Sequence, residues 1–221
     1  MPDDHSLPSI SNLSVSTEEK IRLAALRVFM QKGYDGTRTR DIAEVAGINV
    51  ATLHYYHRKK EQLFELVARE AMRDFTGMYR EVFTHDLPLE EKIRAFVNRS
   101  MDLFSEQPDL AMFCLAESER NPAAFRRIVD FREGYEVVAA DLRALSAKQK
   151  IRPISAPVFI NALVGMTIYP FLTRNTIQQT ASVRGTEFQE MLAEQRRVVP
   201  EMIIAYLFGH PAGPAAIPSE K

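Results

Sequence analysis

The sequence predicts an all-α protein, and three observations support that prediction. Apolar residues recur every three or four positions through most of the chain, which is the spacing of an amphipathic helix. Glycine is scarce, with 9 among 221 residues, and most of the 12 prolines fall near the ends or between periodic segments. No segment approaches the roughly 20 consecutive apolar residues of a membrane-spanning helix. We therefore expect a helical protein that does not enter a membrane.

The composition is that of an ordinary globular protein, with 46% hydrophobic and 26% charged residues. The single cysteine, Cys114, excludes an internal disulfide and favours a reducing, cytoplasmic location. Residues 1–10 have no basic region before an apolar run, so we expect no secretory signal.

The charge is distributed unevenly along the chain. Residues 1–16 have a net charge of −2, residues 17–60 have +4 from nine basic and five acidic side chains, and residues 61–221 have −3. Phosphate binding requires only a local basic surface. The total of −1 is therefore compatible with a nucleic-acid partner for the N-terminal quarter.

The N-terminal quarter begins with a well-defined helix. Ser16 and Glu19 form an S-x-x-E capping box, which marks a helix start. We expect this helix to end near Gly33, with a turn at residues 34–36 and with Thr37 or Thr39 capping the next helix. Its apolar residues follow the i, i+3, i+4, i+7, i+8 pattern and are Ile21, Ala24, Ala25, Val28 and Phe29.

Residues 39–61 predict two short helices joined by a tight turn. Gly47 supplies the turn, and Asn49 is a favourable N-cap for the second helix. Leu53 and Tyr56 are expected to pack inside this region. Two helices across a glycine-bearing turn form a helix-turn-helix unit, whose second helix enters the DNA major groove. The apolar face of the first helix is expected to contain Ile42, Val45 and Ala46.

The rest of the chain also predicts helices. We expect them at residues 60–83, 89–104, 110–119, 123–145, 158–178 and 188–208, with a polar loop at 180–186. Pro157 suits a helix start, and Pro170 is expected to kink the helix that contains it.

The segment GYDGTRTRDIAEVAGINVATLHYYHRKKEQLF resembles the DNA-binding head of the TetR/AcrR family of bacterial transcriptional regulators. The pattern GY-x-x-T-x-x-x-x-IA-x-x-AG is followed by YY and KE in one register over some thirty positions. The resemblance implies a homodimer, usually a repressor, that a small molecule bound to its C-terminal domain releases from a palindromic operator.

The resemblance also implies a division of the chain. The expected fold is all-α, with an N-terminal three-helix helix-turn-helix head and a larger C-terminal helical domain for ligand binding and dimerisation. We expect a disordered arm at 1–15, the DNA-binding domain at 16–60, the effector and dimerisation domain at 61–209, and a disordered tail at 210–221.

The resemblance places DNA contacts in the head, although an exposed charged face is the alternative for its basic residues. Val50 and Ala51 stand where the family often has a basic residue and glycine, so a thymine methyl contact is available to Val50. Lys59 replaces the usual Ser or Thr cap of the fourth helix. The predicted DNA-contacting residues are Arg38, Thr39, Arg40, Asn49, Val50, Ala51, Thr52, His54, Tyr55, His57 and Lys60.

His54 and His57 have a spacing that could also chelate a metal. No carboxylate or cysteine lies near enough in sequence to complete a site, so DNA contact is preferred. We expect no metal and no cofactor.

The candidate effector pocket consists of apolar and aromatic residues of the middle helices. Such residues at helical spacing are more often simply core. An apolar or amphipathic effector is expected. The candidates are Phe75, Met78, Phe96, Met101, Phe104, Met112, Phe125, Phe131, Tyr135, Met166 and Tyr169.

The last two long helices, 157–178 and 187–208, are the predicted dimer interface, paired with their copies as a four-helix bundle. The near-continuous apolar run of the first also suits a central core helix. Both roles are possible on different faces.

The sequence features are compared with three possible functions. The first is the ligand-responsive repressor, and the second is a DNA-binding regulator without a small-molecule ligand, constitutive or protein-controlled and possibly an activator. The third is an enzyme, which is disfavoured because no Ser/His/Asp set, metal cluster or phosphate-binding loop is present. Cys114, inside MFCLA, is expected to be buried and inert.

Overall fold

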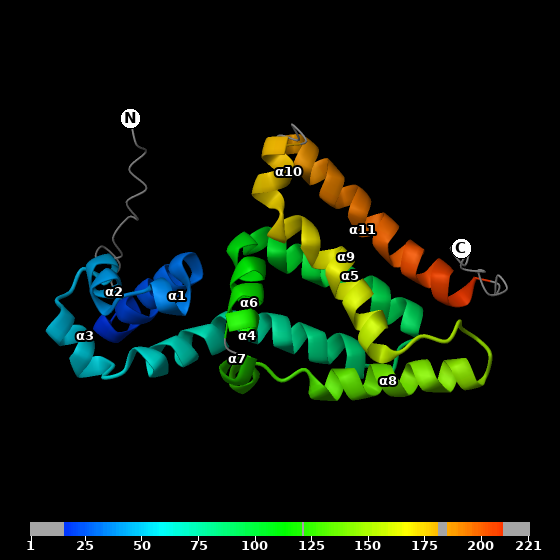
Figure 1. Cartoon of the computed structure of the whole chain (residues 1–221), viewed down its shortest axis with the longest axis horizontal. Coiled ribbons are helices and arrows are strands. Elements are labelled where there is room, and N and C mark those ends of the chain that lie inside the picture. The colour runs from blue at the N-terminus through cyan, green and yellow to red at the C-terminus, as the bar shows by residue number, and fades with distance from the viewer. Residues whose placement is uncertain (1–15, 121, 181–184, 210–221) are drawn as a thin grey trace, which may run out of the picture. The chain divides into compact units, whose positions relative to one another are not determined.

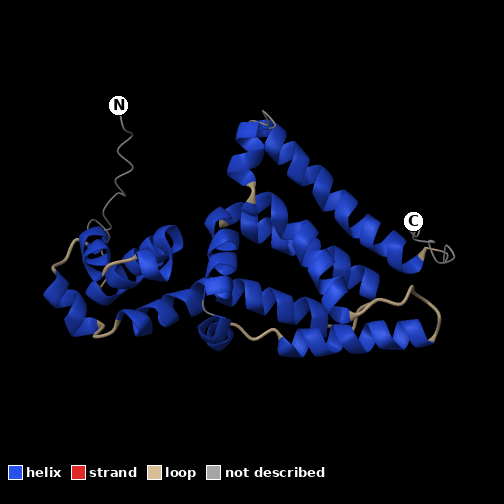
Figure 2. Cartoon of the chain, viewed as in Figure 1, coloured by secondary structure: helices blue, strands red, loops and turns tan. Residues whose placement is uncertain are grey.

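The structure is a computed structural model that describes residues 16–120, 122–180 and 185–209. All secondary-structure elements in these residues are helices, labelled α1 to α11 (Figures 1 and 2). The predicted all-α fold is therefore confirmed. Across the same residues, no helix is both long enough and apolar enough to cross a bilayer. The predicted arm at 1–15 and tail at 210–221 lie outside the described residues.

The chain forms two compact units. The first unit contains the residues up to Gly77 together with Phe104–Asp130, and the second contains Met78–Leu103 together with the residues from Phe131 onward. The boundaries fall inside α4 (Lys60–Thr84) and α5 (Leu89–Glu106), so each of these helices contributes to both units. The functional division at residue 60 stays a prediction.

The first unit begins with α1 (Thr17–Gly36), which packs against α2 (Thr39–Ala46) and α6 (Pro108–Arg120). It also contains α3 (Val50–Tyr56) and α7 (Pro122–Ile128). The Glu19 backbone N–H donates to Ser16 Oγ at 3.2 Å, which confirms the predicted start of α1. The five predicted apolar residues of α1 are all buried.

An aromatic cluster connects the helices of the first unit. Phe29 from α1 and Phe64 from α4 have ring centroids 5.1 Å apart, and Phe64 is 6.1 Å from Phe113 of α6. Tyr34, near the end of α1, lies 5.0 Å from Phe64. Burial of such rings supplies the largest apolar areas of a small core.

Three local expectations for the head were wrong. The N-cap of α2 is Arg38, because the Thr37 hydroxyl is buried and donates to the Gly33 carbonyl at 2.7 Å instead. Ala43 rather than Val45 completes the buried face of α2, which turns the helix by a fraction of a turn from the expected orientation. Tyr56 is exposed, whereas Leu53 is buried as expected.

The second unit contains α8 (Arg132–Ala147), α9 (Ala156–Leu172), α10 (Arg174–Thr180) and α11 (Gly185–Phe208), with parts of α4 and α5. Helix α9 packs against α8, α10 and α11. Tyr79 lies at the centre of its aromatic core, with ring centroids 4.8 Å from Phe83, 4.9 Å from Phe131 and 6.3 Å from Phe96.

The helix predicted at 123–145 is two helices, α7 and α8, separated by residues 129–131. Val129 is buried in the first unit, whereas the Phe131 ring packs on Tyr79 in the second. The backbone leaves the helical path where the chain passes from one core to the other, which periodicity alone does not reveal.

The helix predicted at 158–178 ends at Leu172, and α10 begins two residues later. Pro170 lies inside α9 and has no N–H to donate to the Met166 carbonyl. Gln195 of α11 donates to that carbonyl at 2.6 Å, which replaces the missing bond. Helix α11 begins three residues earlier than expected, and residues 181–184 of the predicted loop lie outside the described residues.

Candidate nucleic-acid interface

The turn between α2 and α3 has the geometry that the sequence indicated. Gly47 adopts the left-handed conformation, with φ 69° and ψ 34°, which a residue without a Cβ takes at little cost. Its N–H donates to the Glu44 carbonyl at 3.1 Å, and the Ile48 N–H donates to the Ala43 carbonyl at 3.0 Å. These bonds end α2 and redirect the chain into α3.

Asn49 caps α3 as predicted. Its side-chain oxygen accepts from the Thr52 backbone N–H at 2.7 Å and from the Thr52 hydroxyl at 3.0 Å. The cap occupies the amide oxygen of Asn49, so the amide nitrogen is the group that remains to donate to DNA.

Asp41 stabilises the first turn of α2. Its carboxylate accepts from the Arg38 backbone N–H at 3.0 Å and pairs with Lys32 at 3.3 Å. The backbone hydrogen bond, with Lys32 and Arg40 nearby, holds the pKa of Asp41 below its usual range. An ionised Asp41 therefore fixes the position at which Thr39 and Arg40 enter α2.

Helix α3 presents a polar and aromatic exposed surface. Only Leu53 is buried among its residues, while Tyr55 is 82% exposed and Val50 is 37% exposed. The Tyr55 and Tyr56 rings lie edge to face with centroids 5.4 Å apart. None of the predicted DNA-contacting residues is buried, and Ala51 and His54 are exposed beside Val50 and Tyr55.

Four exposed cations flank this helix pair. Arg38 and Arg40 lie at the start of α2, and Arg58 and Lys59 follow α3. Within the residues that the structure describes, none of the four forms an ion pair with a carboxylate. Unpaired guanidinium and ammonium groups on one small domain are the groups that release counterions on binding phosphate.

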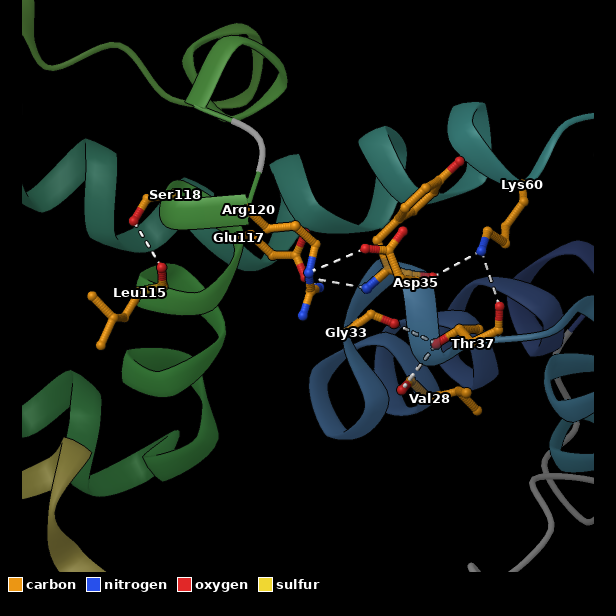
Figure 3. Close-up of polar contacts among 10 residues, drawn as sticks. Val28, Gly33, Asp35, Thr37, Lys60, Leu115, Glu117, Ser118 and Arg120 are labelled. Atoms are coloured by element: carbon orange, nitrogen blue, oxygen red, sulfur yellow. Dashed lines mark hydrogen bonds and ion pairs between the residues drawn. The ribbon is translucent and has the colours of Figure 1, made fainter.

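Lys60 is held by the protein itself. Its Nζ donates to the Tyr34 carbonyl at 2.8 Å and to the Thr37 carbonyl at 3.0 Å, and lies 4.1 Å from the centroid of the Tyr34 ring (Figure 3). An ammonium group has three donors, so one remains for another acceptor. Lys60 thus connects the start of α4 to the end of α1, and its predicted phosphate contact stays a prediction.

Glu117 is a structural residue that the sequence did not reveal. It is 4% exposed, accepts from the Tyr34 backbone N–H at 3.1 Å, and pairs with Arg120 at 2.6 Å. Arg120 also pairs with Asp35 at 3.2 Å (Figure 3). The peptide groups around residue 34 are therefore held from α4 by a cation and from α6 by a carboxylate.

The candidate effector residues lie in different environments. Phe75, Met78, Phe96, Met101 and Phe104 are buried, whereas Met112, Tyr135 and Tyr169 are exposed. Phe125, Phe131 and Met166 are partly exposed. The structure does not bring the eleven together in one cavity: Phe125 lines a cleft of about 290 Å³ in the first unit, and Tyr135 lines an open groove of about 760 Å³ between α8 and the start of α9.

His54 and His57 belong to no metal-binding cluster in the described part of the chain, where no group of three His, Cys, Asp or Glu side chains is arranged to hold an ion. Burial raises the pKa of the Cys114 thiol to about 12. That thiol is protonated near neutral pH and is a poor nucleophile.

The all-α fold, the glycine turn and the capped, exposed second helix define a helix-turn-helix DNA-binding protein. The family model described as bacterial regulatory proteins, tetR family, matches residues 21–67. The chain belongs to the TetR family, as its sequence motif indicated, and is a transcriptional regulator.

Known relatives agree with this assignment. The chain is 24% identical over 194 residues to the probable HTH-type transcriptional regulator YttP of Bacillus subtilis, covering 84% of this chain and 93% of YttP. It is 32% identical over 104 residues to RutR of Escherichia coli, covering 46% of this chain and 49% of RutR.

Among solved structures, AibR in complex with isovaleryl coenzyme A and operator DNA has a similar fold. The TM-score is 0.62 at 19% identity, over 87% of this chain and 98% of that one. At this identity the likeness concerns the fold.

Proposed function

We propose that this protein is a homodimeric repressor that binds a palindromic operator and is released from it by a small apolar or amphipathic effector. The observation that carries the DNA-binding part is the exposed face of α3 with four unpaired cations beside it. Arg38 and Arg40 are on one side of α3 in the sequence, and Arg58 and Lys59 are on the other.

In this proposal the contacts divide into two kinds. Thr39, Arg58, Lys59 and the remaining donor of Lys60 bind phosphate, which sets position without sequence information. Base edges are left to Arg38, Arg40, Val50 and His54, with Tyr55 along the groove wall. A valine at the start of α3 favours a thymine methyl at the base step that it meets.

The dimer is proposed to form through α9 and α11. In the single chain these helices expose large apolar side chains, Val158 and Tyr169 on α9 and Val198, Met202 and Tyr206 on α11. Large apolar side chains exposed on two helices that pack together favour an interface at this place. A C2 dimer would present two copies of α3 to major grooves about 34 Å apart.

The effector class is supported by two observations. Tyr135 and apolar residues line the groove beside α8, which is large enough for a small molecule. AibR, which has a similar fold, has been crystallised in complex with isovaleryl coenzyme A and operator DNA. A cytoplasmic location follows from a DNA target and a single reduced cysteine.

A regulator without a small-molecule ligand is the second candidate. It is favoured by Phe96, Met101 and Phe104, which are at most 1% exposed and fill the core where a ligand was expected. In this case a partner protein or expression level alone would control the regulated genes.

The experiment is a footprint of the protein on the DNA upstream of its own coding sequence, followed by fluorescence anisotropy with the protected fragment. We expect protection of a palindrome and loss of affinity when an effector is added. If the folded protein protected no part of that DNA, binding at this locus would be excluded. If operator affinity were unchanged by every bound ligand, the second candidate would be favoured.

A further inference from the structure

The cleft of about 290 Å³ in the first unit is lined by the end of α1, the start of α4 and helices α6 and α7. Three aromatic rings line it, those of Tyr34, Phe64 and Phe125. Tyr34 and Phe64 meet edge to face, with centroids 5.0 Å apart. The volume is at the small end of ligand sites and suits a compact molecule.

The same cleft is rich in carboxylates. Asp35, Glu61, Glu65 and Glu117 line it, and Arg120 is the one cation among its lining residues. Acidic side chains and aromatic rings therefore line the same cleft.

Two arginines are shared among the four carboxylates. Arg120 pairs with Glu117 at 2.6 Å and with Asp35 at 3.2 Å. Arg127 of α7 pairs with Glu65 at 2.9 Å and reaches Glu61 only at 3.8 Å.

Lys60 lies beside the cleft but forms no ion pair with its four carboxylates. Its Nζ is bound to two backbone carbonyls, although it lies near the Tyr34 ring. Burial raises the pKa of Tyr34, and the negative charges of Glu61 and Asp35 raise it further. The lining residues therefore carry an excess of negative charge beside the partly exposed rings of Tyr34 and Phe125.

We propose that this cleft is a binding site for a small organic cation: a primary amine or amidine on an aromatic or short alkyl body. The charged group would approach Glu61 and Glu65. Arg127 pairs closely with Glu65 but lies 3.8 Å from Glu61, so Glu61 is the weaker-paired carboxylate. The apolar body would pack against the Phe125 ring, because Lys60 Nζ already lies 4.1 Å from the centroid of the Tyr34 ring. The Phe125 face would also attract the charged group. Four lining carboxylates against one lining cation disfavour an anionic ligand.

The site adjoins the contacts that hold the head. Tyr34 lines the cleft, and its backbone N–H and carbonyl are bound by Glu117 and Lys60. A cation that competes with Arg120 or Arg127 would alter the contacts between α6, α7 and the start of α4. The ligand would thereby change operator affinity, a consequence that rests on the proposed DNA-binding function.

Binding is tested on the full chain by isothermal titration calorimetry with two probes of equal size, 2-phenylethylamine and 2-phenylethanol. We expect the amine to bind at least about tenfold more tightly than the alcohol, since only the amine pairs with carboxylates and rings. Equal binding of the two probes, or binding of neither, would overturn the proposal.

Three variants locate the site. Glu65→Gln removes a carboxylate and leaves Arg127 as a competing cation, while Phe125→Leu keeps an apolar side chain without the ring face. Each is expected to weaken amine binding by about three- to tenfold or more. Glu119→Gln, an exposed acid on α6 that does not line the cleft, is the matched control. Unchanged affinity in both test variants, with native circular dichroism, would place the amine elsewhere.

The regulatory consequence has its own readout. With the amine at saturation, the anisotropy-derived operator affinity of the wild type should change, and that of Glu65→Gln should change less. Amine binding with constant operator affinity would contradict the regulatory role. If the protein binds no DNA at all, the proposed function fails, whereas calorimetry still decides the cation site.

Discussion

Both compact units contain an aromatic cluster, but they differ in how charged side chains bind backbone atoms. In the first unit, helix ends are joined by charged groups bound to backbone atoms: Lys60 to the carbonyls of Tyr34 and Thr37, and Glu117 to the N–H of Tyr34. In the second unit, Tyr79 joins the helices through aromatic packing near its centre.

Exposed ion pairs occur in both units, for example Arg73 with Asp74 in the first. Three pairs of the second unit are on its surface, namely Arg94 with Glu201, Arg99 with Glu81, and Arg196 with Asp102. Exposed pairs of this kind contribute little to stability. Lys92, 3% exposed and paired with Asp141 at 2.7 Å, is the exception.

The charged contacts to backbone atoms in the first unit have a functional consequence. Hydrogen bonds from charged groups to backbone atoms are directional and fix helix ends precisely, as a DNA-reading head requires. Apolar packing accepts changes of side chain when volume is conserved. Aromatic packing around Tyr79 in the second unit is therefore expected to tolerate substitutions that conserve volume.

The largest effect is expected from Lys60→Ala, which would remove two charge-assisted hydrogen bonds at once. We expect a loss of about 2 kcal/mol in the free energy of unfolding. Urea denaturation followed by circular dichroism measures it. DNA affinity should fall for every sequence, and the slope of log K against log salt should drop by about 0.9 for one phosphate contact.

Lys59→Ala is the control for that prediction. Lys59 is exposed and follows α3 directly, so its loss should leave stability unchanged while lowering DNA affinity in a salt-dependent manner. If Lys60→Ala were as stable as the wild type, the contrast between the two units would be wrong.

In the second unit, Gly134→Ala should be destabilising by about 1–3 kcal/mol because of overpacking. Gly134 is buried in α8, and a Cβ placed there would lie 2.5 Å from Cε1 of Tyr79. Gly165→Ala in α9, where nothing lies within 4 Å, should instead be stabilising by about 0.5–1 kcal/mol. Thermal unfolding of both variants measures the difference, and an unchanged Tm for Gly134→Ala would show that the Tyr79 ring moves freely.

A smaller effect is expected from Asn49→Ala, which deletes the cap of α3. The loss should be about 1 kcal/mol, seen most clearly as faster hydrogen exchange in α3. Asn49→Ser keeps a capping oxygen and should restore protection. Equal exchange in both variants would mean that the cap does not stabilise the helix.

The smallest effect is confined to alkaline pH and concerns two weakly acidic groups, the buried Tyr79 hydroxyl of the second unit and the partly exposed Cys114 thiol of the first. Burial raises the pKa of Tyr79 to about 12 in the second unit and that of Cys114 to about 12 in the first. A raised folded-state pKa contributes stability that is complete below the unfolded-state pKa, about 10 for Tyr and 8.5 for Cys. Stability should therefore fall from about pH 9 upward because of Cys114 and from about pH 10 because of Tyr79.

Denaturation between pH 8 and 12 tests this prediction in two variants. Cys114→Ala should remove the earlier part of the decline, and Tyr79→Phe should remove the later part. Identical curves for wild type and both variants would show that other groups cause the alkaline loss.

Features that depend on neighbours in the chain were predictable from the amino-acid sequence. The Ser16 cap, the Gly47 turn, the Asn49 cap and the buried face of α1 all arise from residues within a few positions of one another. Such local interactions leave a readable pattern, and with them the family motif identified the helix-turn-helix and its exposed residues.

Contacts between distant parts of the chain are visible only in the folded protein. Lys60 meets Tyr34 across 26 residues and Glu117 meets it across 83, and no spacing rule connects them. The break at residues 129–131 depends on which core receives each side chain. The Met166 carbonyl left free by Pro170 is bound by Gln195. A charged residue in a sequence looks the same whether it faces DNA or a buried carbonyl, because its partner is chosen by packing.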